Sequence, residues 1–306
     1  MIETLKIGEN VKKIIKNLSI EKKESGTYLL YGNDKKELLE VAMVFGKILT
    51  CKNKSNDFCG KCESCVRMES GTHGDLEILR EEAGGKINDI REMIGKMSVT
   101  SYEGGNRIFI LEGIEKMSTT SLNALLKTIE EPNSGNYFFL LTTTLNILST
   151  VKSRSSLVKI LPRTSCELGV DEQEYNFFAG KTRDILEYKQ LKDKNENLLN
   201  SKSNYLEIEK IVEEYGINSD IKNKIELYHA LRIFINEINF INDLEKIFIL
   251  ESIVRGSKEN KEILFLILNY LAFLNSEGLK IEKILEVKNM LHSPLNTSSC
   301  MLRLIL

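Results

Sequence analysis

Short apolar runs alternate with helical patterns along the first half of the chain, between Thr27 and Leu161. The runs have the length and composition of strands, and the segments between them repeat apolar residues every three or four positions. This alternation is typical of an α/β domain with a mostly parallel sheet. The predicted strands are Tyr28–Tyr31, Asp75–Leu79, Arg107–Leu111, Tyr137–Leu141 and Leu157–Leu161.

The segment before the fourth predicted strand is the clearest predicted helix. Leu122, Leu125, Leu126 and Ile129 recur at i, i+3, i+4 and i+7, so they share one helix face. Serine and threonine residues that can cap a helix precede them, and Pro132 stops the run.

Beyond Leu161 the sequence turns polar. Pro162, Gly169 and Gly180 are predicted breaks, and the charged stretch Lys192–Asn200 has little apolar material for a core. This region is interpreted as a small lid and a linker.

After Tyr205 only amphipathic helical patterns remain, with no strand-like alternation. The patterns are Ile225–Ile238, Leu244–Ile253 and Ile263–Leu274, with Gly256 and Gly278 as predicted breaks. The chain has 306 residues, more than one ordinary domain of about 100 to 200. We therefore expect an α/β domain at 1–162, a helical lid and linker at 163–204, and an all-helical domain at 205–306.

The net charge of −2 argues against a free-standing nucleic-acid binder, which usually shows a basic excess. Residues 1–10 contain no apolar signal region, and no stretch approaches the roughly 20 apolar residues that cross a bilayer. We expect a cytoplasmic protein with no membrane contact.

Four of the six cysteines fall within a short segment, with the spacing C-x7-C-x2-C-x2-C. Cys51, Cys59, Cys62 and Cys65 can close a tetrahedral Zn²⁺ site that leaves no position for water, which predicts structural rather than catalytic zinc. Gly60 suits the positive φ that such a knuckle often needs. His73 is the nearest other candidate ligand, but a loop histidine before a strand is the simpler interpretation.

The loop after the first strand lies where a phosphate-binding P-loop would join strand to helix. Against the pattern G-x4-G-K-[ST], Gly32 fits, but Glu37, Leu38 and Leu39 replace the second glycine, the lysine and the hydroxyl. We expect no ATP to bind here. On its own, Gly32 is more simply explained as an ordinary turn residue after a strand than as the remnant of a P-loop.

The Walker B position, after the strand that ends at Leu111, is also incomplete. Glu112 is present, but Gly113 replaces the second carboxylate. No group is then in the usual place to activate an attacking water. Both halves of a hydrolytic site are degenerate together.

The sequence resembles a known family, the clamp-loader subunits of bacterial DNA polymerase III, and among them the δ′ subunits. The similar segments cover about Tyr28–Leu161. They are the cysteine module, Gly71–Leu76 (close to G-x-H-P-D, with Gly74 for proline), Ile90–Glu92, Ser121–Pro132 (close to N-x-L-L-K-x-x-E-E-P), Thr142–Thr144 (a sensor segment) and Lys152–Ser155 (close to S-R-C, with Ser155 for cysteine).

The resemblance implies a fold and a role. The fold is an α/β AAA+-like P-loop-type domain with a parallel sheet and an inserted zinc module, a small helical lid and an all-helical collar domain that holds a pentamer together. The implied role is a non-ATPase stator in DNA replication, with γ/τ and δ subunits in the ring, and with the sliding clamp and primer–template DNA met through the assembly. Arg154 would be an arginine finger that reaches the ATP of a neighbouring subunit, a task suited to a planar, permanently charged guanidinium.

Three alternatives stay open on the sequence alone. A γ/τ-type ATPase subunit shares the cysteine module and the arginine, but Glu37, Leu38 and Leu39 argue against it. A nucleotide-dependent enzyme with an unconventional phosphate loop must bind ATP or GTP as an isolated chain. A zinc-containing DNA-binding module must show salt-sensitive affinity for DNA by itself.

Overall fold

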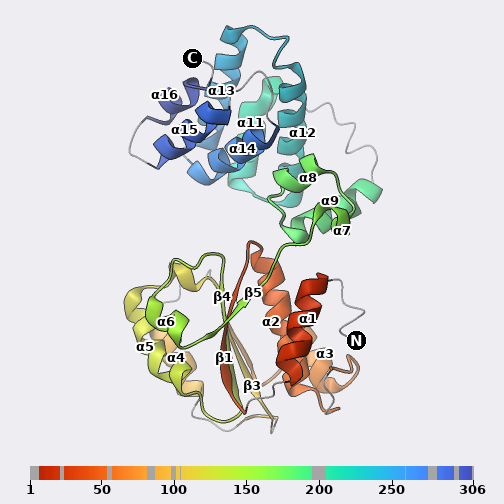
Figure 1. Cartoon of the computed structure of the whole chain (residues 1–306), viewed down its shortest axis with the longest axis vertical. Coiled ribbons are helices and arrows are strands. Elements are labelled where there is room, and N and C mark those ends of the chain that lie inside the picture. The colour runs from red at the N-terminus through yellow and green to blue at the C-terminus, as the bar shows by residue number, and fades with distance from the viewer. Residues whose placement is uncertain are drawn as a thin grey trace. The chain divides into compact units, whose positions relative to one another are not determined.

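The computed structural model describes residues 7–20, 24–53, 57–80, 87–97, 101–103, 105–194, 205–258, 260–274, 281–292 and 296–304. The chain divides into two compact units, Met1–Arg163 and Thr164–Leu306. Unit 1 contains the sheet, and unit 2 is helical in its described residues (Figure 1). Among the described helices, none is both long and apolar enough to cross a membrane.

Unit 1 is built on a five-stranded sheet in the order β2-β3-β4-β1-β5, and every pairing in it is parallel. The strands are β1 (Gly26–Tyr31), β2 (Leu76–Leu79), β3 (Arg107–Leu111), β4 (Asn136–Thr142) and β5 (Ser156–Lys159). All five predicted strands are confirmed. Their ends differ from the predicted ones by two residues at most.

Helices cover both faces of the sheet (Figure 1). The helices of unit 1 are α1 (Glu9–Ile20), α2 (Lys35–Thr50), α3 (Glu63–Glu69), α4 (Ile87–Met97), α5 (Thr119–Glu130) and α6 (Ser149–Ser153). The first three share one hydrophobic core with the sheet, and the last three share the other. Neighbouring residues of a strand face opposite sides, so Phe139 packs in the first core and Phe138 in the second.

Helix α5 confirms the clearest predicted helix. Ser118 caps it by accepting a hydrogen bond from the amide of Ser121, and Leu122, Leu125 and Ile129 are buried. Glu131 follows as the C-cap, directly before Pro132.

Unit 2 is organised around one hydrophobic core. Its helices are α7 (Ser165–Leu168), α8 (Glu172–Phe177), α9 (Thr182–Lys194), α11 (Ile208–Ile217), α12 (Ile221–Glu237), α13 (Asp243–Ser257), α14 (Lys261–Leu274), α15 (Ile281–Leu291) and α16 (Thr297–Leu302). The rings of Phe177 and Phe178, from the expected lid, pack in tilted orientations against Tyr228 of the expected helical domain. The described parts of both expected domains therefore lie in the same compact unit, while residues 195–204 are outside the described residues.

The predicted break at Gly256 is wrong, because Gly256 lies inside α13. A Cβ atom added there would lie 2.3 Å from the carbonyl oxygen of Glu209 in α11. The glycine allows the two helix backbones to approach closely rather than ending a helix. The predicted breaks at Gly169 and Gly180 are confirmed, because both glycines lie between helices and adopt positive φ values of 62° and 63°. The predicted break at Gly278 lies outside the described residues.

Candidate functional site

The loop after β1 is short and ends in a helix cap formed by the chain itself. Helix α2 begins at Lys35, and the Asp34 carboxylate accepts hydrogen bonds from the amides of Lys36 (3.0 Å) and Glu37 (3.3 Å). In a P-loop, amides at this helix end bind phosphate. Here an oxygen of the Asp34 carboxylate accepts hydrogen bonds from two of these amides.

Gly32 is explained by packing. A Cβ atom at this position would lie 2.8 Å from the carbonyl oxygen of Ile160, which follows β5. The glycine therefore lets the end of β1 lie against the end of β5, its neighbour in the sheet. Its presence does not require a bound phosphate.

The three residues that replace the rest of the P-loop pattern are directed largely into the protein. Glu37 and Leu38 are 2% and 1% exposed. Leu39 packs at the edge of the core that α1, α2 and α3 share with the sheet. Leu38 and Leu39 also line a cleft of about 600 Å³ at the carboxyl ends of β1, β3 and β4. The cleft has the position expected for a ligand site in a parallel sheet, but apolar side chains stand where the phosphate-binding groups would be.

The Walker B position faces the same cleft. Glu112 forms an ion pair with Arg80, with 3.5 Å between Oε1 and Nη1, and Gly113 adopts a left-handed conformation with φ of 62°. Glu112 lines the same cleft as Leu38 and Leu39. Its carboxylate is paired with a cation of the chain itself.

Glu115 is a cleft residue that the sequence reasoning missed. Its Oε1 accepts hydrogen bonds from the hydroxyl (2.8 Å) and the amide (3.3 Å) of Thr143, in the expected sensor segment. Burial alone would raise the pKa of the Glu115 carboxyl, but hydrogen bonds from its own amide and from Thr143 and Thr142 lower it. The carboxylate fixes the end of β4 in place.

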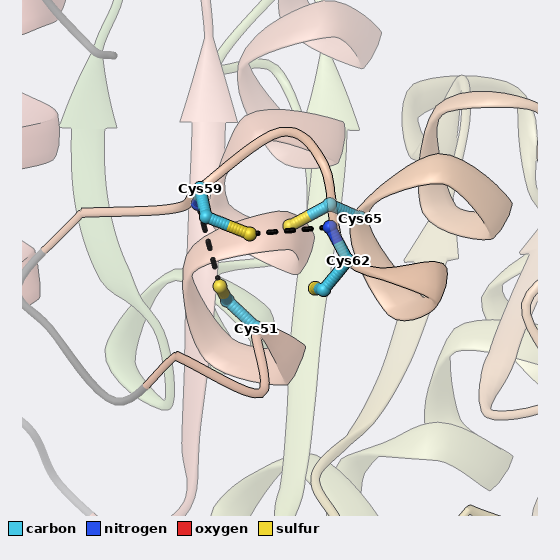
Figure 2. A group of neighbouring side chains, drawn as sticks. All are labelled: Cys51, Cys59, Cys62 and Cys65. Atoms are coloured by element: carbon cyan, nitrogen blue, oxygen red, sulfur yellow. Dashed lines mark hydrogen bonds between the residues drawn. The ribbon is translucent and has the colours of Figure 1, made fainter.

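The structure brings the four predicted metal ligands together at the end of α2 (Figure 2). Their ligand atoms all lie within 4.8 Å of one another. A tetrahedral Zn²⁺ site with Zn–S bonds of about 2.3 Å needs sulfur atoms about 3.8 Å apart, so small shifts would suffice. Cys51 follows α2, Cys65 lies in the first turn of α3, and Gly60 has the predicted positive φ of 68°.

Backbone amides already point at the sulfur atoms. The amide of Cys59 donates to Cys51 Sγ (3.4 Å), and the amide of Cys62 donates to Cys59 Sγ (3.3 Å), as Figure 2 shows. Hydrogen bonds from the amides of Lys61 and Cys62 lower the pKa of the Cys59 thiol to about 6, whereas burial raises that of Cys65 to about 12. Amide donors around thiolates are the outer-shell arrangement of metal sites, so the residues fit Zn²⁺.

His73 does not join the cysteine cluster but connects it to the sheet. The side chain is 2% exposed; Nδ1 accepts from the amide of Asp75 (3.1 Å), and Nε2 lies 3.0 Å from Ser64 Oγ. Because Nδ1 is an acceptor, Nε2 carries the hydrogen and donates to Ser64, which in turn donates to the carbonyl of Thr50 (2.9 Å). With this tautomer His73 cannot act as a base toward Ser64, so the pair is no hydrolytic dyad.

Replacing His73 by alanine is expected to destabilise unit 1 by about 2–4 kcal/mol, because the change opens a cavity and leaves buried groups unpaired. Thermal unfolding with sheet-sensitive circular dichroism measures the effect. His73→Asn keeps an acceptor near the amide of Asp75 and should lose less. An unchanged midpoint for His73→Ala would show that the connection contributes nothing to stability.

Arg154 is the C-cap of α6, two residues before β5. Its Nε donates to Glu130 Oε2 (2.8 Å) and its Nη1 to the carbonyl oxygen of Thr150 (3.3 Å). The Arg154 side chain is 30% exposed. Arg154 is thus near the surface of unit 1 and is not part of the cleft lining.

Unit 1 is thus a parallel α/β domain with helices on both faces of its sheet, and with a loop at the P-loop position that lacks the phosphate-binding residues. A family model described as DNA polymerase III, delta subunit, matches residues 7–164, more than half of the chain. The chain belongs to this family, and the names of its relatives identify it with the δ′ subunits.

Two of these relatives are named DNA polymerase III subunit delta′. That of Pseudomonas aeruginosa is 32% identical over 132 residues, 42% of this chain and 40% of the relative. That of Bacillus subtilis is 29% identical over 163 residues, 52% of this chain and 49% of the relative. The match spans less than half the length of these relatives.

A solved structure supports the fold of the whole chain. A DNA polymerase III γ subunit-related protein of Thermotoga maritima superposes with a TM-score of 0.60 at 18% identity, and 97% of each chain is covered. At this identity the similarity establishes the fold alone.

Proposed function

We propose that this chain is a non-ATPase subunit of the sliding-clamp loader in DNA replication, and that Arg154 acts as an arginine finger on the ATP of a neighbouring subunit. The observation that carries the proposal is the β1–α2 loop. Asp34 caps the amides that would hold a phosphate, and Glu37, Leu38 and Leu39 stand at the other P-loop positions.

The proposed partners are those that membership of the family suggests. We propose γ/τ and δ subunits in a pentameric ring, in the cytoplasm, with the sliding clamp and primer–template DNA met through the assembly. In this proposal the described helices from α11 onward, which share the core of unit 2, would belong to the expected collar at 205–306. Relatives named γ and τ, such as the τ subunit of Bacillus subtilis at 27% identity over 136 residues, support a place among these subunits.

Structural Zn²⁺ is the second part of the proposal. Cys51, Cys59, Cys62 and Cys65 would hold it, and a site closed by four thiolates supplies cross-linking rather than catalysis. The zinc would fix the segment between α2 and α3.

Equilibrium binding of Mg·ATP to the purified chain tests the proposal. Isothermal titration should detect no binding, because the loop lacks the lysine, the hydroxyl and the free amides of a P-loop. An ATP-hydrolysing γ/τ subunit is the positive control. Saturable binding by this chain would instead support a γ/τ-type ATPase or an enzyme with an unconventional phosphate loop. Salt-sensitive DNA binding by the isolated chain would favour the independent DNA-binding module.

A further inference from the structure

Two fixed contacts hold the guanidinium group of Arg154. Glu130 Oε2 binds Nε at 2.8 Å, and the Thr150 carbonyl oxygen binds Nη1 at 3.3 Å. Among the described residues, no acceptor binds Nη2. Since a guanidinium is planar, contacts to two of its nitrogen atoms fix its plane and the direction of the third.

The position of Glu130 is unfavourable for its own helix. Glu130 is the last residue of α5, where the carbonyl ends of the helix make a negative charge unfavourable. Arg154 offsets this charge, but the pair is solvent-exposed, with side chains 30% and 52% exposed, so it contributes little to folding. Stability alone therefore gives little reason for the carboxylate to be here.

The same contact has a clear use for an arginine that must meet an external phosphate. A free arginine side chain samples many rotamers, and a guanidinium held in advance loses less freedom when it binds. The contact to Thr150, at the C-terminal end of α6, adds a second support from the backbone.

We propose that Glu130 is a positioning residue for Arg154, holding the guanidinium by Nε so that Nη2 is presented to the γ-phosphate of the neighbouring subunit. This inference rests on the proposed function. Glu130 touches no substrate and acts through Arg154. In the assembled ring the carboxylate keeps its contact with Nε while the phosphate binds Nη2.

The test is a double-mutant cycle in the complex reconstituted with γ/τ and δ subunits, read as clamp- and DNA-stimulated ATPase. Glu130→Ala should lower kcat by about tenfold to a hundredfold, the cost of misplacing a catalytic group by about 1 Å, with the KM for ATP little changed. Glu130→Gln keeps an oxygen acceptor and should retain most of the rate. Glu131→Ala, an exposed neighbour with the same charge change, is the matched control and should have no effect.

The cycle separates the two proposals. Glu130→Ala should cause no further loss when Arg154 is already alanine, because Glu130 then has nothing to position. Full activity of Glu130→Ala, or a loss that adds to that of Arg154→Ala, would overturn the positioning role alone. If Arg154→Ala itself leaves the ATPase unchanged, Arg154 is not the arginine finger, and the positioning role of Glu130 fails with it. Thermal unfolding of Glu130→Ala should match the wild type, which excludes misfolding as the cause.

Discussion

Replacing Arg154 by alanine is expected to slow the ATPase of the reconstituted complex by about 10³-fold or more at the site this subunit completes, as for arginine fingers supplied in trans. The guanidinium would stabilise charge that develops on the γ-phosphate oxygens, and alanine leaves that charge unmatched. Steady-state ATPase with clamp and primed DNA measures the total rate, and single-turnover assays isolate the affected site.

Folding and assembly should be unaffected by this change, because the Arg154 side chain is partly exposed and its ion pair with Glu130 contributes little. Lys159→Ala, which removes an exposed positive charge from β5, is the control and should leave the rate unchanged. Arg154→Lys should recover little, since the single nitrogen of an ammonium group cannot keep the contacts to Glu130 and Thr150 and also meet the phosphate as the separate nitrogen atoms of a guanidinium can. A normal single-turnover rate for Arg154→Ala would contradict the finger role.

The second large effect is expected at the cysteine cluster. Cys59→Ser should abolish the binding of Zn²⁺ and lower the unfolding midpoint of unit 1 by roughly 10 °C, the equivalent of about 3–5 kcal/mol for a domain of this size. Zinc sites supply much of the stability of small modules, but here the sheet core remains after the metal is lost. Metal analysis and calorimetry on the same preparation give both quantities.

Cys166→Ser is the matched control, because Cys166 is exposed and lies outside the cluster. It should keep both the metal and the midpoint. A wild-type protein purified without chelators that contains no zinc would contradict the structural-zinc proposal, whatever the stability of the variant.

The sheet could be predicted because its strands are short apolar runs between helical patterns, and β4 is buried along its whole length. Helix α5 could be predicted from its periodicity and its caps. The role of Gly256 could not be predicted, because the sequence does not show that the backbone of Glu209 approaches this position and leaves no room for a side chain. The expected lid and helical domain are two parts by composition, yet Phe177, Phe178 and Tyr228 join them in one core.

The candidate sites were predicted where spacing along the chain determines them. Cys59, Cys62 and Cys65 follow one another closely, so their convergence needs only a turn. Glu130, which binds Arg154, and Ser64, which binds His73, lie 24 and 9 residues away in sequence, and no spacing pattern identifies them as partners. Glu130 lies within Ser121–Pro132, the segment that resembles a family signature, and this resemblance was the sequence signal for it. The segment does not indicate which residue the Glu130 carboxylate contacts.

Asp34 has a consequence for how unit 1 responds to the nucleotide cycle. Asp34 binds the amides of Lys36 and Glu37. If the loop binds no ATP, as proposed, these contacts would persist whatever the ratio of ATP to ADP in the cell. A ligand that does not bind cannot shift a conformational equilibrium. Unit 1 would then keep one conformation through every round of hydrolysis, as a fixed reference against which subunits that do exchange nucleotide can move.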